Sequence, residues 1–379
     1  MSSMDRKLTL TVLAAVAMAT CHAQIPDLMT ALDAGGRAMG LGGGTYGTDA
    51  TTWSINANPA ALGFIRNPMF GASFRNMPES RTSASGNFDD QNFDTELETG
   101  ANGVSHLGYA TPMFGGTLGL SFTRTGFIRD EKFGDGLSSG NLTVRNYEDF
   151  LKAYTDQYTI AWGKTLDGGT TNFGVGFVLA SQYIDSQLRY DLFNGNQYLN
   201  TVTSDNSGNG FGVGAVAGLI FSPAGSNTSA GISIQTPIDL SGNDDTGAFY
   251  DRIPGRISGS LAARTDAGGG SRDYLLYGVQ ANHYFGGEGD KLIPRTNYTS
   301  IGGGLEYGMH RWGARIPIRV GYVVVADGGA GFGNRDTFTF GVGYRPNNSD
   351  FSIDLSFAKP VDGNDFDMAL SITLFTSGN

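Results

Sequence analysis

Apolar residues recur at every second position through most of the chain, from about residue 68 to the C-terminal end. This period of two is that of a β-strand, because a helix would repeat its apolar residues every three or four positions. Between residues 171 and 184, for example, Phe173, Val175, Phe177 and Leu179 face one way and mostly small residues face the other. Each predicted strand therefore has one apolar face and one small or polar face.

The alternating segments predict about fourteen strands, an even number, as in bacterial membrane barrels. They lie near residues 68–76, 104–111, 115–128, 153–163, 171–184, 210–221, 228–238, 256–264, 273–285, 299–309, 315–326, 335–346, 350–358 and 366–375. Short turns at 112–114, 164–170, 222–227, 265–272, 310–314 and 347–349 alternate with longer connections at 77–103, 129–152, 185–209, 239–255 and 286–298, and with shorter ones near 327–334 and 359–365. Such alternation is typical of membrane barrels, and it predicts that both ends of the barrel segment lie on the periplasmic side.

The N-terminal residues 1–23 have the pattern of a cleaved secretory signal peptide. Arg6 and Lys7 precede the apolar stretch 8–19, and Cys21 and Ala23 are small residues ahead of a predicted cut before Gln24. In the alternative, Cys21 is the acylated residue of a lipoprotein. Either process exports the chain, and we expect a cell outer membrane location in a Gram-negative bacterium.

A soluble β-sandwich or β-helix would also show one apolar face on each strand. Export, strands of membrane-crossing length, and aromatic residues near strand ends such as Tyr158, Trp162 and Phe375 favour a membrane barrel instead. In lipid, the backbone groups of an open edge would be unsatisfied, so the sheet must close. We predict an all-β fold: a transmembrane antiparallel β-barrel of about fourteen strands over 67–379, with an N-terminal luminal plug over 24–66.

Composition narrows the possible functions. The chain has 25 Lys and Arg against 36 Asp and Glu, which gives a formal net charge of −11. It therefore lacks the excess of positive charge that is typical of a nucleic-acid-binding protein. No run of about 18 apolar residues predicts a transmembrane helix. His106, His283 and His310 are too scattered in the sequence to suggest a metal site. We expect no enzyme activity, no catalytic or metal-binding residues, and no cofactor.

Residues 24–66 do not alternate, and they are mostly small and polar. Such a segment ahead of a barrel is either a flexible linker or a plug whose small residues pack tightly inside the lumen. Its Gly36-Arg-Ala-Met-Gly-Leu-Gly-Gly43 stretch, its Asp49-Ala50 pair and its Asn58-Pro59-Ala60 turn resemble the N-terminal signature of the outer-membrane hydrophobic-compound transporter superfamily. That superfamily includes FadL-like long-chain fatty-acid transporters, toluene transporters and PorV/PorQ-type proteins, and the resemblance implies a fourteen-stranded barrel with an N-terminal hatch.

Two hypotheses about function follow from this resemblance. In the first, the barrel mediates the passage or binding of hydrophobic small molecules of fatty-acid or aromatic type. In the alternative, favoured by the compact Gly-Arg-Ala-Met-Gly form, it is a PorV/PorQ-like accessory or shuttle component of type IX protein secretion, with secretion-system proteins as partners. A non-specific porin is a third interpretation. Inward positions carry mainly Gly, Ser, Thr and Ala, with occasional Val178, Ile220, Leu276, Val323 and Val325.

Candidate ligand-binding residues lie in the plug and on one strand. Trp53, Ile55, Asn58 and Pro59 would line a narrow apolar crevice in the plug. Arg315 and Arg319 lie on the same face of their predicted strand, and their apolar neighbours lie on the opposite face. Because a charge on a lipid-facing position costs about 2–4 kcal/mol, we expect both arginines to point inward. They would either bind an anionic head group or pair with inward acids such as Asp354 and plug carboxylates.

Outer-membrane lipid and lipopolysaccharide are the other expected partners. Acidic stretches at 89–98 and 243–245 could bind divalent cations that bridge lipopolysaccharide phosphates. The simpler interpretation is that they are solvated loop tips.

Overall fold

The computed structural model describes residues 35–45, 48–88, 91–135, 137–139, 141–241, 252–267, 272–287, 297–326, 335–347, 350–361 and 366–376. The predicted signal peptide, Cys21 and the first part of the predicted plug lie outside these residues. Short helices are α2 (Gly36–Gly40), α3 (Ser54–Ala57) and the 3-10 helices η2 (Pro59–Phe64) and η3 (Asp167–Gly169). Among the described residues, no helix is long and apolar enough to cross a membrane.

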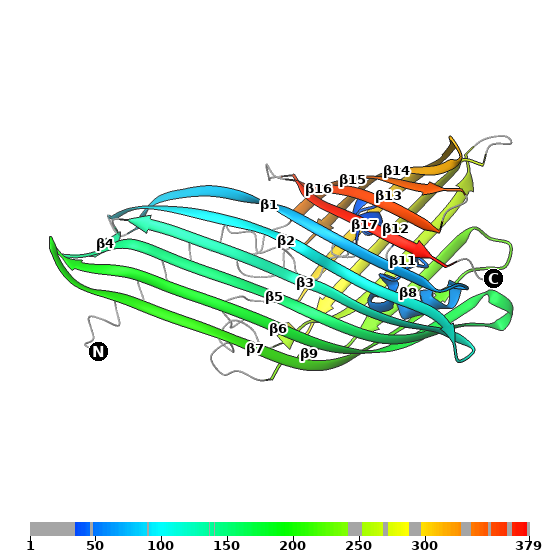
Figure 1. The fold of residues 1–379 in the computed structure, drawn as a ribbon, viewed down its shortest axis with the longest axis horizontal. Coiled ribbons are helices and arrows are strands. Elements are labelled where there is room, and N and C mark those ends of the chain that lie inside the picture. Colours follow the sequence, from blue (N-terminus) through cyan, green and yellow to red (C-terminus); the bar gives the residue numbers. More distant parts are fainter. Residues whose placement is uncertain are drawn as a thin grey trace.

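The rest is a closed antiparallel β-barrel of fourteen strands (Figure 1). The strands are β1 (Met69–Phe88), β2 (Gln91–Met113), β3 (Gly116–Asp135), β5 (Leu142–Leu166), β6 (Thr171–Asn194), β7 (Gln197–Phe221), β8 (Thr228–Gln235), β11 (Gly255–Asp266), β12 (Tyr274–Phe285), β13 (Tyr298–Arg311), β14 (Ala314–Val325), β15 (Arg335–Pro346), β16 (Phe351–Pro360) and β17 (Asp367–Phe375). β4 (Leu137–Ser139) only extends the edge of β5, and β9 (Ile238–Asp239) pairs with β10 (Arg252–Ile253).

The first and last strands close the sheet. Met69 pairs with Phe375 and Asn76 pairs with Met368, so β1 and β17 form a continuous ladder of eight residue pairs. Closure leaves no open edge at the level of the membrane, where an unpaired N–H or C=O group would cost several kcal/mol. The predicted fold class, strand number and transmembrane closure are confirmed.

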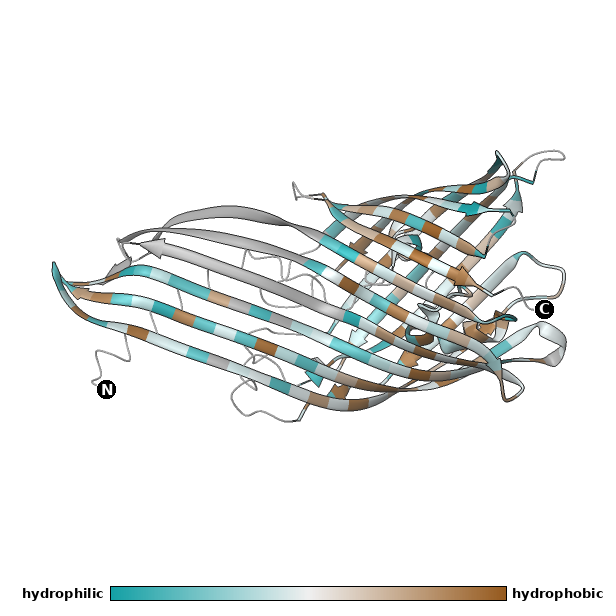
Figure 2. Cartoon of the chain, in the orientation of Figure 1, coloured by the Kyte–Doolittle hydropathy of each residue, from teal (hydrophilic) through white to brown (hydrophobic). Residues whose placement is uncertain are grey.

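The two faces of the wall differ as the alternation predicts. On β6, Val175, Phe177 and Leu179 are exposed on the outside, whereas Val178 and Ala180 are fully buried inside. Figure 2 shows the resulting succession of hydrophobic and hydrophilic bands along the strands. The outward apolar side chains form the surface that a bilayer covers.

Three of the predicted long loops are wrong. Segments 77–103, 129–152 and 185–209 largely continue the strands, so that β1, β2, β3, β5, β6 and β7 have 20–25 residues each. The other eight barrel strands have 8–14 residues. Figure 1 shows the six long strands projecting as one curved sheet beyond the rest of the barrel.

The projecting parts of these strands were not predicted as strands because their outer face carries charged residues. A bilayer accounts for only about 9–11 residues of each strand, and beyond it no apolar outer face is required. Across β5 and β6, Lys152 pairs with Asp185, Glu148 with Arg189 and Arg145 with Asp191 in the strand register. Opposite charges on facing positions suit a hydrated sheet, and they remove the apolar alternation that identified the lower halves.

The predicted loop at 239–255 begins with a segment that turns into the lumen. After Thr236, whose N–H donates to the Ala215 oxygen at 3.0 Å, Pro237 cannot continue the ladder, and the chain rejoins β7 only at Ser241. The bulge packs on the inside of β7, where a Cβ on Gly214 would lie 2.7 Å from Ile238 Cγ1. The short β9–β10 pair therefore lies against the inner wall.

A charge in the middle of the outward apolar face should prevent stable insertion. Val320 is half-exposed near the centre of β14, so Val320→Arg should destabilise the barrel by about 2–4 kcal/mol in lipid vesicles. Urea unfolding in vesicles measures this difference. Gln187→Arg, on the outer face of the projecting sheet, is the matched control and should change little. Equal effects of the two variants would contradict the assigned membrane level.

Candidate functional site

The described plug residues 35–45 and 48–65 lie inside the barrel (Figure 1). Helix α2 contacts β14, β15, β16 and β17, whereas α3 and η2 contact β3, β5 and β6 on the other side of the ring. The described residues 35–45 and 48–65 thus cross the lumen from wall to wall. They lie near the end where the short turns and the C-terminus are found, called the short-turn end below. The luminal plug is confirmed, whereas its limits at 24 and 66 stay a prediction.

Inward glycines of the wall allow the plug backbone to lie directly on the strands. A Cβ on Gly304 would lie 2.6 Å from the Leu41 oxygen, and one on Gly119 would lie 2.7 Å from Ile55 Cγ1. Side chains on Gly163 and Gly174 would collide with Pro59. The high glycine content of the chain, 58 residues, is therefore partly a requirement of plug packing.

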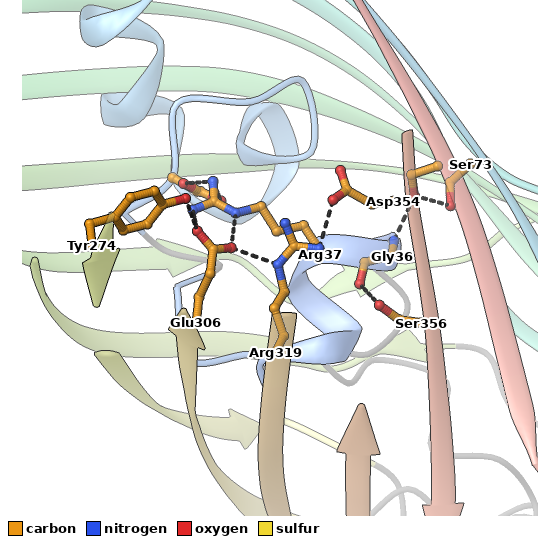
Figure 3. Close-up of polar contacts among 10 residues, drawn as sticks. Gly36, Arg37, Ser73, Tyr274, Glu306, Arg319, Asp354 and Ser356 are labelled. Carbon is orange, nitrogen blue, oxygen red and sulfur yellow. Dashed lines mark hydrogen bonds and ion pairs between the residues drawn. The ribbon is translucent and has the colours of Figure 1, made fainter. Parts of the chain in front are cut away.

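A buried charge network joins the plug to the wall (Figure 3). Glu306 of β13 lies at its centre: Oε2 accepts from Arg319 Nε at 2.6 Å and from Arg37 Nε at 3.2 Å, and Oε1 accepts from the Tyr274 hydroxyl at 2.6 Å. The side chain of Glu306 is 1% exposed and that of Arg319 is 3% exposed. Because buried charges are tolerated only when paired and hydrogen-bonded, this geometry fixes the position of α2.

Two further carboxylates complete the network. Asp49 of the plug binds Arg37 Nη1 through both of its oxygens at 2.6 Å, and Asp354 of β16 lies 2.6 Å from Arg319 Nη1. Burial alone would lower the pKa of the Arg37 guanidinium, but Asp49 and Glu306 outweigh it and raise the pKa well above its ordinary value. Arg37 is therefore charged throughout the physiological pH range.

Backbone contacts fix the start of α2 beside this network. The Gly36 N–H donates to Ser371 Oγ at 2.6 Å, and Ser356 Oγ donates to the Gly36 oxygen at 2.5 Å. Ser73 Oγ lies 3.0 Å from Ser371 Oγ, which extends the polar contacts to β1. No side chain of the plug caps the start of α2. Inward-facing serine hydroxyls of the wall provide hydrogen bonds to its backbone groups instead.

The two arginines predicted from strand parity both face inward. Arg319 pairs with Asp354, so the structural pairing, one of the two predicted alternatives, is confirmed for this residue. Arg315 is half-buried, with its guanidinium carbon 5.4 Å from the centroid of the Tyr274 ring. The structure does not bring the two arginines onto one partner, and anion binding by either of them stays a prediction.

The four predicted plug residues are buried between plug and wall. Trp53 stacks on His106 with ring centroids 5.0 Å apart, and Ile55 packs against Leu62 in a separate apolar cluster. Asn58 Oδ1 accepts from the Ala60 N–H at 3.1 Å, and Pro59 begins η2. These residues hold the plug together in the conformation observed. Ligand contact by Trp53, Ile55, Asn58 and Pro59 therefore stays a prediction, and in this conformation their side chains have no open face.

A second apolar cluster lies on the inner wall, beside the inward bulge. Tyr284 is fully buried and stacks on Tyr298, with ring centroids 4.3 Å apart. The cluster, called the luminal apolar cluster below, consists of Val178, Ala180, Ile184, Val216, Ile238, Ile253 and Tyr284. Sequence parity identified Val178 as inward, but Ile238 and Ile253 lie in or beside a predicted outer loop and were missed.

Glu306, the centre of the network, was also missed in the sequence. It is the one acidic residue within β13, on a strand otherwise rich in glycine, and its parity is inward. Its register partner across β14 is Arg319, so a search for opposite charges on facing positions would have found the pair. Arg37 could not be found in this way, because the plug has no strand register.

Potential metal ligands do not cluster in the part of the chain that the structure describes. No group of three or more His, Cys, Asp or Glu side chains in that part of the chain could hold a metal ion. His106 Nδ1 lies 3.0 Å from Thr123 Oγ1, and its Nε2 lies 3.2 Å from Thr52 Oγ1, which makes it a wall residue in contact with the plug. The acidic stretches proposed for cation binding, 89–98 and 243–245, have no described side chains.

Solved structures of hydrophobic-compound channels share this architecture. The toluene transporter TbuX of Ralstonia pickettii superposes with a TM-score of 0.62 at 13% sequence identity, covering 90% of this chain and 98% of that chain. A Pseudomonas aeruginosa FadL homologue gives a TM-score of 0.57 at 14% identity, covering 90% and 98%. A TodX monoaromatic hydrocarbon channel mutant gives 0.64 at 10% identity, covering 91% and 99%.

No protein-family profile matches the sequence, and no curated protein sequence is similar to it. The structural likeness nevertheless covers nearly the whole of each channel. The chain has the fold of the FadL-type hydrophobic-compound channels, as the N-terminal signature predicted.

Removing the central carboxylate should loosen the plug. Glu306→Gln leaves Arg37 and Arg319 facing each other without the shared anion, which should weaken plug docking by about 3 kcal/mol. That change corresponds to roughly a hundredfold faster proteolytic cleavage within residues 35–66 of the assembled barrel. Asp239→Asn, which removes the exposed partner of Arg252, is the control and should have little effect. Unchanged cleavage of the Glu306→Gln variant would contradict the anchoring role.

Proposed function

We propose that the protein mediates the passage or binding of hydrophobic small molecules, of fatty-acid or aromatic type, across the outer membrane. The observation that carries this proposal is the luminal apolar cluster, which adds large apolar side chains to the inner wall of a plugged barrel. A porin for polar solutes has a polar, water-filled interior, whereas Tyr284, Ile238 and Ile253 are apolar and fully buried inside this lumen. The structural likeness to channels whose names refer to toluene and monoaromatic hydrocarbons supports the same assignment.

On the proposed route a ligand meets the luminal apolar cluster before the plug, and it reaches these buried side chains only when they separate. Burial of apolar ligand surface contributes about 25 cal/mol per Å², so contact over about 200 Å² contributes on the order of 5 kcal/mol before association costs. Trp53 and Ile55 are buried between plug and wall, so a ligand reaches them only when the plug shifts. In this proposal, Asn58 and Pro59 shape the plug surface against which the ligand then slides.

The proposal includes the cellular setting. The signal peptide over 1–23 directs export, the short-turn end faces the periplasm, and outer-membrane lipid and lipopolysaccharide surround the apolar and charged outer faces. The protein has no catalytic role in this proposal. The PorV/PorQ-like hypothesis also stays open as a prediction, because a likeness to small-molecule channels does not bear on secretion partners.

Replacing the plug tryptophan should weaken uptake of a hydrophobic probe. Trp53→Ala removes the ring that stacks on His106, and we expect about tenfold slower uptake of toluene or decanoate into proteoliposomes, equivalent to about 1.4 kcal/mol. Trp312→Ala is the matched control, since Trp312 is 89% exposed in a turn. If the unmodified protein takes up neither probe, the transport proposal fails and the secretion-accessory hypothesis is preferred.

Deleting the plug should open the barrel to ions. A variant without residues 36–64 loses the segment that crosses the lumen, so its single-channel conductance in planar bilayers should rise well above that of the unmodified protein. Heat-modifiable migration on gels checks that the shortened barrel still assembles. An assembled variant with unchanged conductance would show that the segment does not block the pore.

A further inference from the structure

Three arginines gather on the inner wall at the short-turn end. The guanidinium carbons of Arg264 and Arg315 lie 3.9 Å and 5.4 Å from the centroid of the Tyr274 ring, and that of Arg345 lies 4.2 Å from the centroid of the Phe375 ring. Arg315 and Arg345 are register partners on β14 and β15. We call Arg264, Arg315 and Arg345 the arginine row.

The arginine row lacks carboxylates of the kind that pair with several other arginines of the lumen. Arg37, Arg75 and Arg319 all have ion pairs with Asp or Glu. Among the described residues, no ion pair joins a member of the row to a carboxylate, and the buried Nε of Arg315 has no hydrogen-bond acceptor.

Neighbouring carboxylates do not neutralise the row either. Asp273 binds Arg311 and accepts from the His310 backbone N–H, and Glu306 belongs to the plug network. Asp266 shares the inner face of β11 with Arg264 but forms no ion pair with it among the described residues. The wall thus holds more positive than negative charge at this level, in a chain whose net charge is −11.

Like charges on directly facing positions of neighbouring strands destabilise a sheet, and an oxyanion bound by both guanidinium groups would offset this repulsion. Cβ atoms of such partners are about 4.5–5.5 Å apart, which allows two guanidinium groups to converge on one ligand. The planar guanidinium donates two parallel hydrogen bonds to a carboxylate or phosphate. The geometry of the arginine row suits an oxyanion better than it suits a neutral compound.

We propose that the arginine row binds the oxyanion of an acidic amphiphile as it leaves the plug. This inference rests on the proposed function and narrows it, since it favours cargo with an apolar chain and an anionic group over neutral hydrocarbons. Arg315 comes four residues before Arg319 in β14, so it lies about 13 Å closer to the short-turn end along the strand. A ligand that passes the plug network in this direction meets the row next.

The test compares one acyl chain with and without its charge. Binding of labelled decanoate and decanol to the full chain in amphipol is measured by equilibrium dialysis for the unmodified protein and for the double variant Arg315→Gln and Arg345→Gln. We expect decanoate binding at least about tenfold weaker in the double variant, with decanol binding nearly unchanged. Arg252→Gln removes the same charge far from the row and serves as the control.

Inorganic phosphate distinguishes the two sources of the anion. If excess phosphate displaces decanoate, the row binds free oxyanions; if it does not and the double variant still loses decanoate, the row requires an acyl chain. Both results support the proposal. Equal decanoate binding by the double variant, or no preference for decanoate over decanol in the unmodified protein, overturns it.

Failure of the proposed function gives a different result. If neither amphiphile binds the unmodified protein, the proposed transport of such compounds is rejected. Binding of inorganic phosphate then tests the arginine row directly. Phosphate binding that is lost in the double variant supports an anion site at the row, and no phosphate binding by the unmodified protein overturns that site. If the double variant fails to assemble, Arg315→Lys with Arg345→Lys keeps the charge but not the planar fork. Decanoate binding by this Lys variant should then be weaker than in the unmodified protein while decanol binding is unchanged, and unchanged decanoate binding would contradict recognition by the fork.

Discussion

The hydrogen-bond ladder between β1 and β17 is the constraint on which the rest of the structure depends. A sheet in lipid cannot leave its edge groups unpaired, so the strands must form a ring, and a ring encloses a lumen that has to be filled or left open. In this chain, many side chains at inward-facing positions are small enough for the plug backbone to pack directly against the wall. Gly119, Gly304 and Gly321 lie against plug atoms at distances that no Cβ would allow. The same glycines that thin the wall thereby determine where the plug fits.

The lumen that results has distinct regions with different chemistry. The luminal apolar cluster lies beside the inward bulge, the plug with its charge network lies nearer the short-turn end, and the arginine row lies beyond the network. An apolar region followed by a cationic one matches a molecule with an apolar chain and an acidic group. Neither region alone carries that argument, because apolar inward residues also stabilise a wall and arginines at a strand end are also compatible with water.

Much of the fold could be predicted from the sequence, because lipid contact forces apolar residues onto one parity. Strands such as β14 and β17 were located to within one or two residues. The upper halves of β5, β6 and β7 could not, since water contacts their outer face and Asp185 or Arg189 is as suitable there as an apolar residue. In the site, parity predicted that Arg319 points inward, and its pairing with an inward acid such as Asp354 was one of two alternatives. The contact between Arg37 and Glu306 depends on how an irregular segment docks, and no periodicity of the sequence encodes that.

The charge network can separate without leaving an unpaired buried arginine. Arg37 and Asp49 both belong to the plug, so their ion pair does not depend on the wall. Arg319, Glu306 and Asp354 all belong to the wall, where Arg319 keeps two carboxylates when the plug leaves. Among the described residues of the network, the ion pair between Arg37 and Glu306, at 3.2 Å, joins the two halves. Because breaking a buried pair is most costly when one charge loses every partner, this division lowers the cost of displacing α2 while preserving a single docked position.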